Sequence, residues 1–215
     1  MKLYSVDLSP FAARVRAAIY AKNLPVEIVA PPESGTKSDE YLALNPMGRV
    51  PVLVAADGFA LPESDTIVEY LADAFPDSGL RPSTPEGKAR ARLIARVTEL
   101  YVMQQLQPLF GQMNPATRDQ VVVDDAIEKL KGALVHLNVF LGDGPYAAGE
   151  TLTTADCALI PVLFFIQLIG PIFGAGDMLE GLLKLSDYAE RLKMDPVAQK
   201  VGSEMQAGLR ARQGG

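Results

Sequence analysis

The chain has 215 residues, of which 48% are hydrophobic and 21% are charged, a balance typical of globular proteins with a sizeable core and not of disordered chains. Its formal net charge of -6 at pH 7, with no cluster of lysine and arginine to offset it, argues against a nucleic-acid partner. Cys157 is the only cysteine and His136 the only histidine, which excludes an intramolecular disulfide and argues against a structural zinc site and a serine-histidine-aspartate triad.

The chain begins with strand and helix patterns in alternation. Residues 2–6 fit a short strand, and Pro10 suits the first turn of a helix whose apolar positions recur at helical spacing. A second β-branched run covers residues 26–29. We therefore expect a strand-helix-strand unit at the start of the fold.

A hairpin and a helix follow. Residues 51–55 form a third β-branched run, and Asp57-Gly58 predicts a tight turn into residues 59–61. Residues 64–75 then show apolar positions at helical spacing, which predicts a helix. The segment as a whole reads βαβ followed by ββα.

The segment 76–85 has three prolines, a glycine and no periodicity, which is typical of a linker. We therefore expect two domains, one over residues 1–77 and one over residues 87–215, joined by a linker at residues 78–86.

Everything beyond the linker reads as helix. Helical patterns cover residues 87–112 and 118–141, and a segment rich in glycine interrupts them at residues 142–149. Thr153 and Asp156 have the spacing of a capping box, in which Asp156 reaches back to the backbone of the cap residue. A further helix is therefore expected to begin directly after Thr153.

The longest apolar run, residues 158–173, is about 16 residues long and contains two prolines, so we interpret it as a buried core helix and expect no membrane partner. The first residues lack the apolar core of a secretory signal, which favours a cytoplasmic location. The terminal Gly214 and Gly215 are expected to fray.

The segment from Val50 to Ser64 has features of a receptor for a small peptide. A proline at the start of a strand cannot donate to the ladder, so Pro51 fits an edge, a bend or a cis turn and leaves the backbone groups of Val50 free for a ligand. Ser64 is expected at the N-cap of the following helix, where unpaired N–H groups and the helix dipole favour a carboxylate.

Four segments in this order resemble the cytosolic glutathione transferases, over nearly the whole chain. The segments are Ser9 to Val15 after the first strand, Asn45 to Leu53, Glu63-Ser64 at a helix start, and Thr153-x-x-Asp156. The resemblance implies an α/β plus all-α protein, with a thioredoxin-like N-terminal domain of order βαβ-α-ββα and an all-helical C-terminal domain. It also implies a homodimer, with Asp65 as a residue that reaches toward the partner subunit.

The resemblance further implies which residues hold glutathione, the co-substrate of this family. Ser9 is expected at the glutathione sulfur, and Val50, followed by a cis Pro51, at the main chain of the cysteinyl moiety. Glu63 and Ser64 are expected at the γ-glutamyl end. Lys37 resembles a lysine placed near the glycine carboxylate, and no metal is implied.

The segment Ser9-Pro10-Phe11 is most similar to tau-like and omega-like members, with serine where omega-like proteins carry cysteine. Maleylacetoacetate isomerases are also similar, although they have Ser-Ser-Cys at this position. Because a free thiol titrates near pH 8.5, a transferase must favour the thiolate. A hydroxyl donor at Ser9 and the N-terminus of the following helix would do so.

The site for a hydrophobic electrophile is expected between the first strand-helix loop and the helix after the linker. Candidates for this acceptor site are Leu8, Phe11, Tyr101, Met103, Gln104, Gln105, Phe110 and Met113. An aromatic and methionine stripe at helical spacing equally fits a core face.

Several of these residues also have a structural interpretation. Ser9 fits an ordinary N-cap, Glu63 and Lys37 fit solvated charges, and Tyr4 fits a core position in the first strand.

The remaining reactive or charged residues are expected to have no catalytic task. We expect Arg14 and Arg16 to form surface or interdomain ion pairs, Cys157 to be a buried and inert thiol, and His136 to be an ordinary helix residue.

The sequence thus predicts a glutathione S-transferase that adds the thiol to a hydrophobic electrophile. Two alternatives stay open at this point. One is a noncatalytic protein that binds glutathione or hydrophobic ligands, and the other is a narrow glutathione-dependent isomerase or ether-cleaving enzyme.

Overall fold

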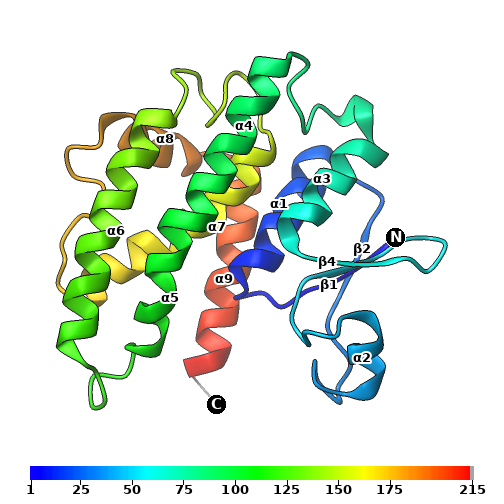
Figure 1. Cartoon of the computed structure of the whole chain (residues 1–215), viewed down its shortest axis with the longest axis horizontal. Helices are drawn as coiled ribbons and strands as arrows, with labels where there is room; N and C mark the ends of the chain where they lie inside the picture. The colour runs from blue at the N-terminus through cyan, green and yellow to red at the C-terminus, as the bar shows by residue number, and fades with distance from the viewer. Residues whose placement is uncertain (214–215) are drawn as a thin grey trace.

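The computed structural model describes residues 1–213 and has two parts (Figure 1). A small sheet with its helices forms the N-terminal part, and helices alone form the C-terminal part. Helices α1 and α3 lie between the sheet and the helices of the C-terminal part (Figure 1). This arrangement agrees with the expected thioredoxin-like domain followed by a helical one. The expected fraying of Gly214 and Gly215 lies outside the described residues.

The sheet has four short strands in the order β2-β1-β3-β4. They are β1 (Lys2–Tyr4), β2 (Glu27–Val29), β3 (Val52–Val54) and β4 (Ala60–Pro62). β1 pairs parallel with β2 and antiparallel with β3, and β3 pairs antiparallel with β4. All four strands were predicted, and the hairpin at Asp57-Gly58 joins β3 to β4 because Gly58 adopts φ +87°.

Three helices accompany the sheet: α1 (Pro10–Lys22), α2 (Asp39–Leu44) and α3 (Ser64–Ala74). α1 is buried on all sides from Ala12 to Ile19, because it packs against α3 within its own part and against α7 and α9 of the other. Arg14 and Arg16 are therefore buried, and the expectation of a surface position for them is wrong; the expectation of interdomain ion pairs is confirmed.

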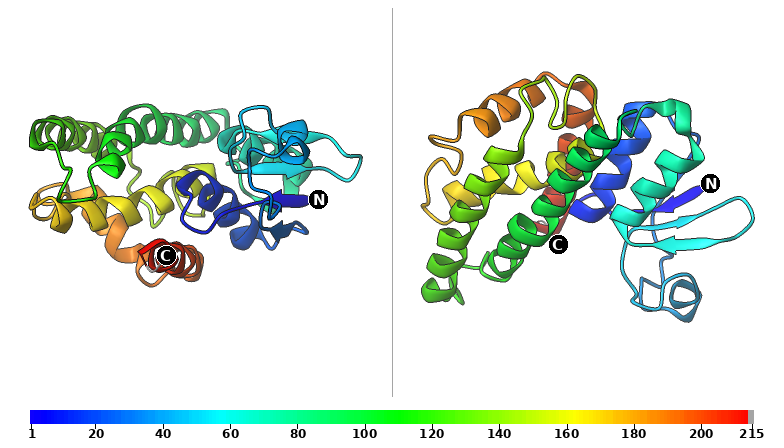
Figure 2. Two further views of the ribbon diagram at one scale, coloured as in Figure 1. Left: turned by 90° about the horizontal axis from the view of Figure 1, so that it is seen from below. Right: turned by 45° about the horizontal axis from the view of Figure 1, so that its top comes forward.

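The C-terminal part consists of long helices joined by loops (Figure 2). They are α4 (Pro85–Val97), the π-helical segment η2 (Thr98–Met103), α5 (Gln104–Gly111), α6 (Gln120–Phe140), α7 (Thr154–Ile172), α8 (Leu183–Leu192) and α9 (Pro196–Gln213). The helix predicted over residues 87–112 corresponds to α4, η2 and α5 together. It begins two residues earlier, at Pro85, because Thr84 accepts a hydrogen bond from the Gly87 N–H and caps it.

α7 is the central helix of this part, and its burial confirms the predicted core helix. By length and composition alone it could cross a membrane, yet 72% of its apolar window is buried inside the fold. At its start the Asp156 carboxylate accepts a hydrogen bond from the Thr153 N–H, as the capping box requires.

The segment between the two parts is held in place rather than free. It contains the 3-10 turn η1 (Pro76–Ser78), and Leu80 is fully buried. The Leu80 carbonyl accepts a hydrogen bond from the Thr154 N–H at 3.0 Å. The segment is thereby docked against the first turn of α7.

Candidate functional site

Ser9 occupies the N-cap position of α1. Its backbone is extended, and its Oγ accepts a hydrogen bond from the Ala12 N–H at 3.2 Å. The capping role uses only the acceptor side of the hydroxyl, so its hydrogen can still be donated to another group. The structural and catalytic interpretations of Ser9 are therefore compatible.

Val50 lies just before β3 and beside this loop. The pairing of Tyr4 with Val52 in the antiparallel β1-β3 ladder brings Val50 next to the residues that follow β1. The Val50-Pro51 peptide bond is cis, as the resemblance implies. Within residues 1–213 neither the N–H nor the carbonyl of Val50 has a hydrogen-bond partner, so both are available to a ligand backbone.

The approach to Val50 is braced by two side chains that bind one carbonyl. Tyr41 Oη and Asn45 Nδ2 both donate to the Arg49 carbonyl oxygen, at 3.0 and 2.8 Å. Asn45 Oδ1 also accepts from the Met47 N–H at 3.0 Å. The Asn45-Pro46 segment thus fixes the loop that presents Val50.

Glu63 and Ser64 leave β4 beside Pro51, because Pro62 pairs with Val52 across the hairpin. The expectation that Ser64 is the N-cap of α3 is wrong, since Glu63 holds that position with φ +71° and Ser64 is the first helical residue. No side chain caps this helix, which leaves N–H groups of its first turn open to an anion. A non-glycine residue at positive φ costs about 1–3 kcal/mol, and such strain gathers at functional sites.

Lys37 is exposed and lies against the same loop as Val50. Its Nζ donates to the Met47 carbonyl at 3.0 Å, and its chain passes over Gly48, where a Cβ would stand 2.9 Å from Lys37 Cδ. The ammonium group is thus held near the loop without an acidic partner among residues 1–213.

A cavity of about 1220 Å³ lies between the two parts of the molecule. Ser9 and Val50 both line it, together with Leu8 on the same side. The opposite side is mainly apolar and is formed by Phe110, Met113, Phe165 and Leu168. The cavity can therefore hold a polar ligand against the loops and an apolar one against the helices.

The predicted acceptor residues divide into two groups. Leu8, Phe110 and Met113 line the cavity, whereas Phe11, Tyr101, Met103, Gln104 and Gln105 are not among the described residues around it. The side chain of Met103 belongs to the core, and Tyr101 is 55% exposed on the other side of the same helical segment. On this side of the cavity the lining residues lie at and after the end of α5, and not at its start.

Part of the cavity is lined by residues that the sequence did not indicate as part of the site. Phe165, Leu168 and Ile169 come from α7, and Leu209 and Arg212 come from α9. α7 is apolar around its whole circumference, so its sequence gives no signal for the strip that faces a cavity.

The remaining candidates have structural positions. Cys157 is fully buried, and burial raises the pKa of its thiol far above the ordinary range, so it is inert. His136 is exposed on α6, and Tyr4 packs edge-on against Tyr41. Within the described part of the chain, no three acidic, histidine or cysteine side chains gather as metal ligands.

Asp65, expected to reach toward a partner subunit, lies 3.5 Å from Arg14 Nη1 of its own chain. Arg14 also binds Glu99 of η2 at 3.1 Å. Burial raises the pKa of the Asp65 carboxyl, and the nearby Arg14 opposes this rise. The three charges join α1, α3 and η2 across the two parts.

Two family models match the chain: the glutathione S-transferase N-terminal domain over residues 3–79 and the glutathione S-transferase C-terminal domain over residues 120–191. The chain belongs to the glutathione S-transferase family. This transferase is 31% identical over 195 residues to glutathione S-transferase GST-4.5 of Xanthomonas campestris pv. campestris, with 87% of each chain covered.

Two further proteins show the breadth of the family around this transferase. It is 31% identical over 179 residues to a maleylacetoacetate isomerase of Pseudomonas aeruginosa, covering 79% of this chain and 83% of that one. Its fold matches that of glutathione S-transferase I from maize, solved with an atrazine glutathione conjugate, with a TM-score of 0.79 and 29% identity over 95% of this chain and 97% of that one.

Proposed function

We propose that this transferase binds glutathione along the loops of its N-terminal part and activates the thiol through Ser9. The observation that carries the proposal is that Ser9, at the N-terminus of α1, and the unpaired backbone of Val50 line one cavity with an apolar far wall. The cysteinyl backbone would pair with Val50 and place its sulfur toward Ser9.

The two ends of glutathione find complementary groups in this arrangement. The γ-glutamyl end would lie at the open N-terminus of α3, where the Glu63 carboxylate can bind its ammonium group and the Ser64 N–H its carboxylate. The glycine carboxylate would lie near Lys37.

The chemistry follows from the position of the sulfur. The Ser9 hydroxyl donates a hydrogen bond to the thiolate, and the α1 N-terminus adds a favourable dipole. A combined shift of about two pKa units, roughly 2.7 kcal/mol, makes most of the bound thiol a thiolate at pH 7. The thiolate then attacks a hydrophobic electrophile held against Phe110, Met113 and Phe165, by substitution or addition.

The substitution Ser9→Ala tests this proposal. We expect the pKa of bound glutathione to rise by up to about two units, and the conjugation rate at pH 7 to fall by up to about 25-fold as the thiolate fraction drops from about three quarters to about 3%. The measurement is a thiolate absorbance titration of the enzyme-glutathione complex, together with conjugation kinetics. An unchanged titration in the mutant would overturn the role of Ser9.

Thr84→Ala provides the matched control. Thr84 caps α4 as Ser9 caps α1, but it does not line the cavity. Each variant loses one N-cap bond, a stability cost of about 1 kcal/mol, whereas only Ser9→Ala is expected to shift the thiol pKa.

The similarity to a maleylacetoacetate isomerase supports a narrower alternative, a glutathione-dependent isomerase or ether-cleaving enzyme. A noncatalytic binding protein is the other alternative. Retention on immobilised glutathione without turnover of a panel of electrophiles would favour one of these two. Conjugation that depends on Ser9 would favour the transferase.

The proposal extends to the setting of the enzyme: a homodimer in the cytoplasm, with the domain boundary at residues 78–86. Its support is the family resemblance and the position of α4 and α3 on either side of the docked segment. A molar mass near that of one chain in light scattering would overturn the dimer.

A further inference from the structure

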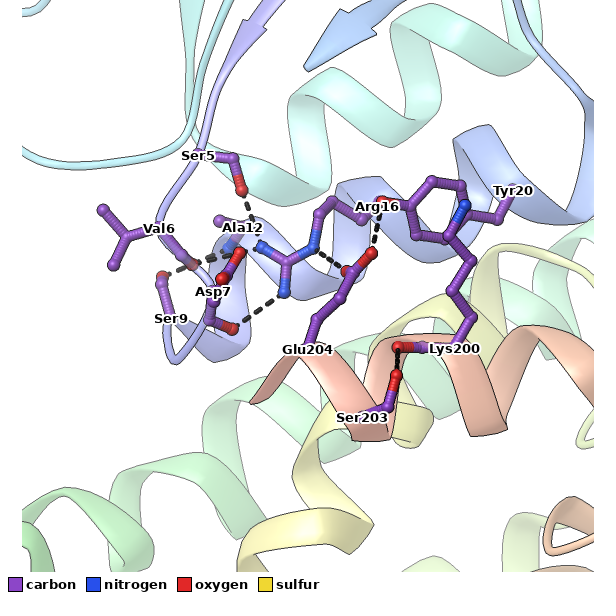
Figure 3. Close-up of polar contacts among 10 residues, drawn as sticks. All are labelled: Ser5, Val6, Asp7, Ser9, Ala12, Arg16, Tyr20, Lys200, Ser203 and Glu204. Carbon is purple, nitrogen blue, oxygen red and sulfur yellow. Dashed lines mark hydrogen bonds and ion pairs between the residues drawn. The ribbon is translucent and has the colours of Figure 1, made fainter. Parts of the chain in front are cut away.

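The loop that carries Ser9 is held by one buried side chain. Arg16, in the second turn of α1 and only 1% exposed, donates from Nη1 to Ser5 Oγ at 2.6 Å and to the Val6 carbonyl at 3.1 Å (Figure 3). Its Nη2 donates to the Asp7 carbonyl at 2.8 Å. One guanidinium group therefore binds three consecutive residues just before Leu8 and Ser9.

The same arginine is bound from α9. Arg16 Nε donates to Glu204 Oε2 at 2.7 Å, and Tyr20 Oη donates to Glu204 Oε1 at 2.7 Å (Figure 3). Both carboxylate oxygens of Glu204 are thus used by α1. Lys200, one turn earlier on α9, lies with its Nζ 3.7 Å from the centre of the Tyr20 ring.

Gly208 continues this contact one turn after Glu204, on the same face of α9. A Cβ at Gly208 would stand 2.7 Å from the Leu8 nitrogen, which is too close, and 3.1 Å from Asp7 Cβ, which is a tight contact. Only a glycine lets the backbone of α9 lie this near the loop. Glu204 therefore binds the loop through Arg16, and Gly208 meets it directly.

We propose that α9 is the positioning element of the Ser9 loop, with Glu204 and Gly208 as positioning residues. The inference rests on the proposed role of Ser9. It adds that α9 sets where that hydroxyl stands. Because Gly208, Leu209 and Arg212 also line the cavity, the same helix connects the electrophile side of the site to the sulfur side.

A purely structural contact would act on the stability of the fold alone. A positioning contact also acts on the bound thiol, because a hydroxyl displaced by a fraction of an ångström loses much of its hydrogen bond to the sulfur. The two roles therefore differ in their effect on the thiol pKa of the enzyme-glutathione complex.

Gly208→Ala is the first test, with Gly202→Ala as its matched control. Gly202 lies on the same helix, and a Cβ there meets nothing within 4 Å. Both variants gain the same helix propensity, so only Gly208→Ala pushes on the loop. We expect Gly208→Ala to raise the thiol pKa and to lower conjugation by about tenfold or more, and Gly202→Ala to match the wild type.

Glu204→Gln is the second test and adds no volume. The amide oxygen can still accept from Arg16 Nε and the N–H₂ group can donate to Tyr20 Oη, but the negative charge that pairs with the buried Arg16 guanidinium is lost, so its hydrogen bond is weakened. We expect faster amide exchange in residues 5–9 and a thiol pKa shifted in the same direction as in Gly208→Ala.

Hydrogen exchange of residues 5–9 separates this inference from the proposed function. Unchanged loop exchange in both Gly208→Ala and Glu204→Gln overturns the positioning role, whatever the chemistry of Ser9. Faster loop exchange with an unchanged thiol pKa also overturns it and leaves a structural contact. If the wild type forms no thiolate, the proposed function fails, and the exchange data still decide whether α9 holds the loop.

Discussion

Two buried side chains of opposite charge, Arg16 and Asp156, each hold one loop of this transferase in place. Arg16 is a cation that donates four hydrogen bonds, to Ser5, Val6, Asp7 and Glu204.

Asp156 is the corresponding anion. It accepts four hydrogen bonds, from the Ala147 N–H, the Thr153 N–H and hydroxyl, and the Tyr188 hydroxyl. Like Arg16, it joins a loop to helices that lie far away in the sequence. Burial raises the pKa of the Asp156 carboxyl, and its four donors oppose this rise.

The two centres differ in what their loops carry. None of the donors to Asp156 lines the cavity, whereas Val6 lines it and the loop held by Arg16 continues into Leu8 and Ser9. The same chemistry therefore serves the fold in one place and the site in the other. Mutations at the two centres should separate stability from activity.

The largest effect is expected for Asp156→Ala. It leaves the Ala147 and Thr153 N–H groups and the Tyr188 hydroxyl without a buried acceptor, so the free energy of unfolding should fall by about 3–5 kcal/mol. Denaturant unfolding measures the loss. The folded fraction should keep its wild-type turnover, and a reduced turnover per folded molecule would contradict the separation.

Arg16→Lys should have a smaller effect on stability and a larger one on activity. Lysine keeps the charge but has a single point of donation, so at most three of the four acceptors can be met. We expect a loss of about 1–3 kcal/mol in unfolding free energy and a clear fall in conjugation rate. Turnover equal to the wild type at temperatures where the variant is folded would break the comparison.

The smallest effect concerns the two tyrosines that donate to these centres at high pH. Burial, and then hydrogen bonds to Glu204 and the charge of Asp156, raise the pKa of Tyr20 and of Tyr188 above the ordinary value of 10. The pKa of each tyrosine is higher in the folded state than in the unfolded state. The stability that each protonated hydroxyl contributes is therefore fully present below about pH 10 and is lost as the pH rises toward the folded-state pKa.

The measurement is the unfolding free energy of wild type, Tyr20→Phe and Tyr188→Phe between about pH 9 and pH 11. Each variant should show a flatter decline than the wild type. Only Tyr20→Phe, at the centre beside the site, should also alter the pH profile of conjugation. A profile altered by Tyr188→Phe instead would reverse the assignment of the two centres.

Signals confined to a few residues made much of the fold predictable. The Asp57-Gly58 turn, the proline at the start of α1 and the Thr153-x-x-Asp156 spacing each act through neighbouring backbone groups, so the sequence alone locates them. The predicted N-cap of α3, Ser64, is wrong by one residue. Glu63 is the N-cap, and its positive φ cannot be read from the residue type.

Features set by distant packing were not predictable. Arg16 looks like a surface charge until α7 and α9 cover α1, and its partner Glu204 is 188 positions away. Gly208 on α9 reads only as a weak point in a helix, although the loop of residues 7 and 8 requires it. The part of the apolar cavity wall that α7 contributes was not predictable for the same reason, because only the packing of α7 shows which of its sides faces the cavity.

The contact between α1 and α9 joins two segments of this enzyme that are synthesised at different times. Ser9 is synthesised before the carboxylate that secures its loop, because Glu204 follows Arg16 by 188 positions. The thioredoxin-like part can form its sheet while synthesis continues, since domains fold as units during synthesis. The loop that carries Ser9 reaches its final geometry only after α9 has been made and has docked against α1. A chain stopped short of α9 would therefore contain Ser9, the residue proposed to activate the thiol, without the contacts that hold its loop.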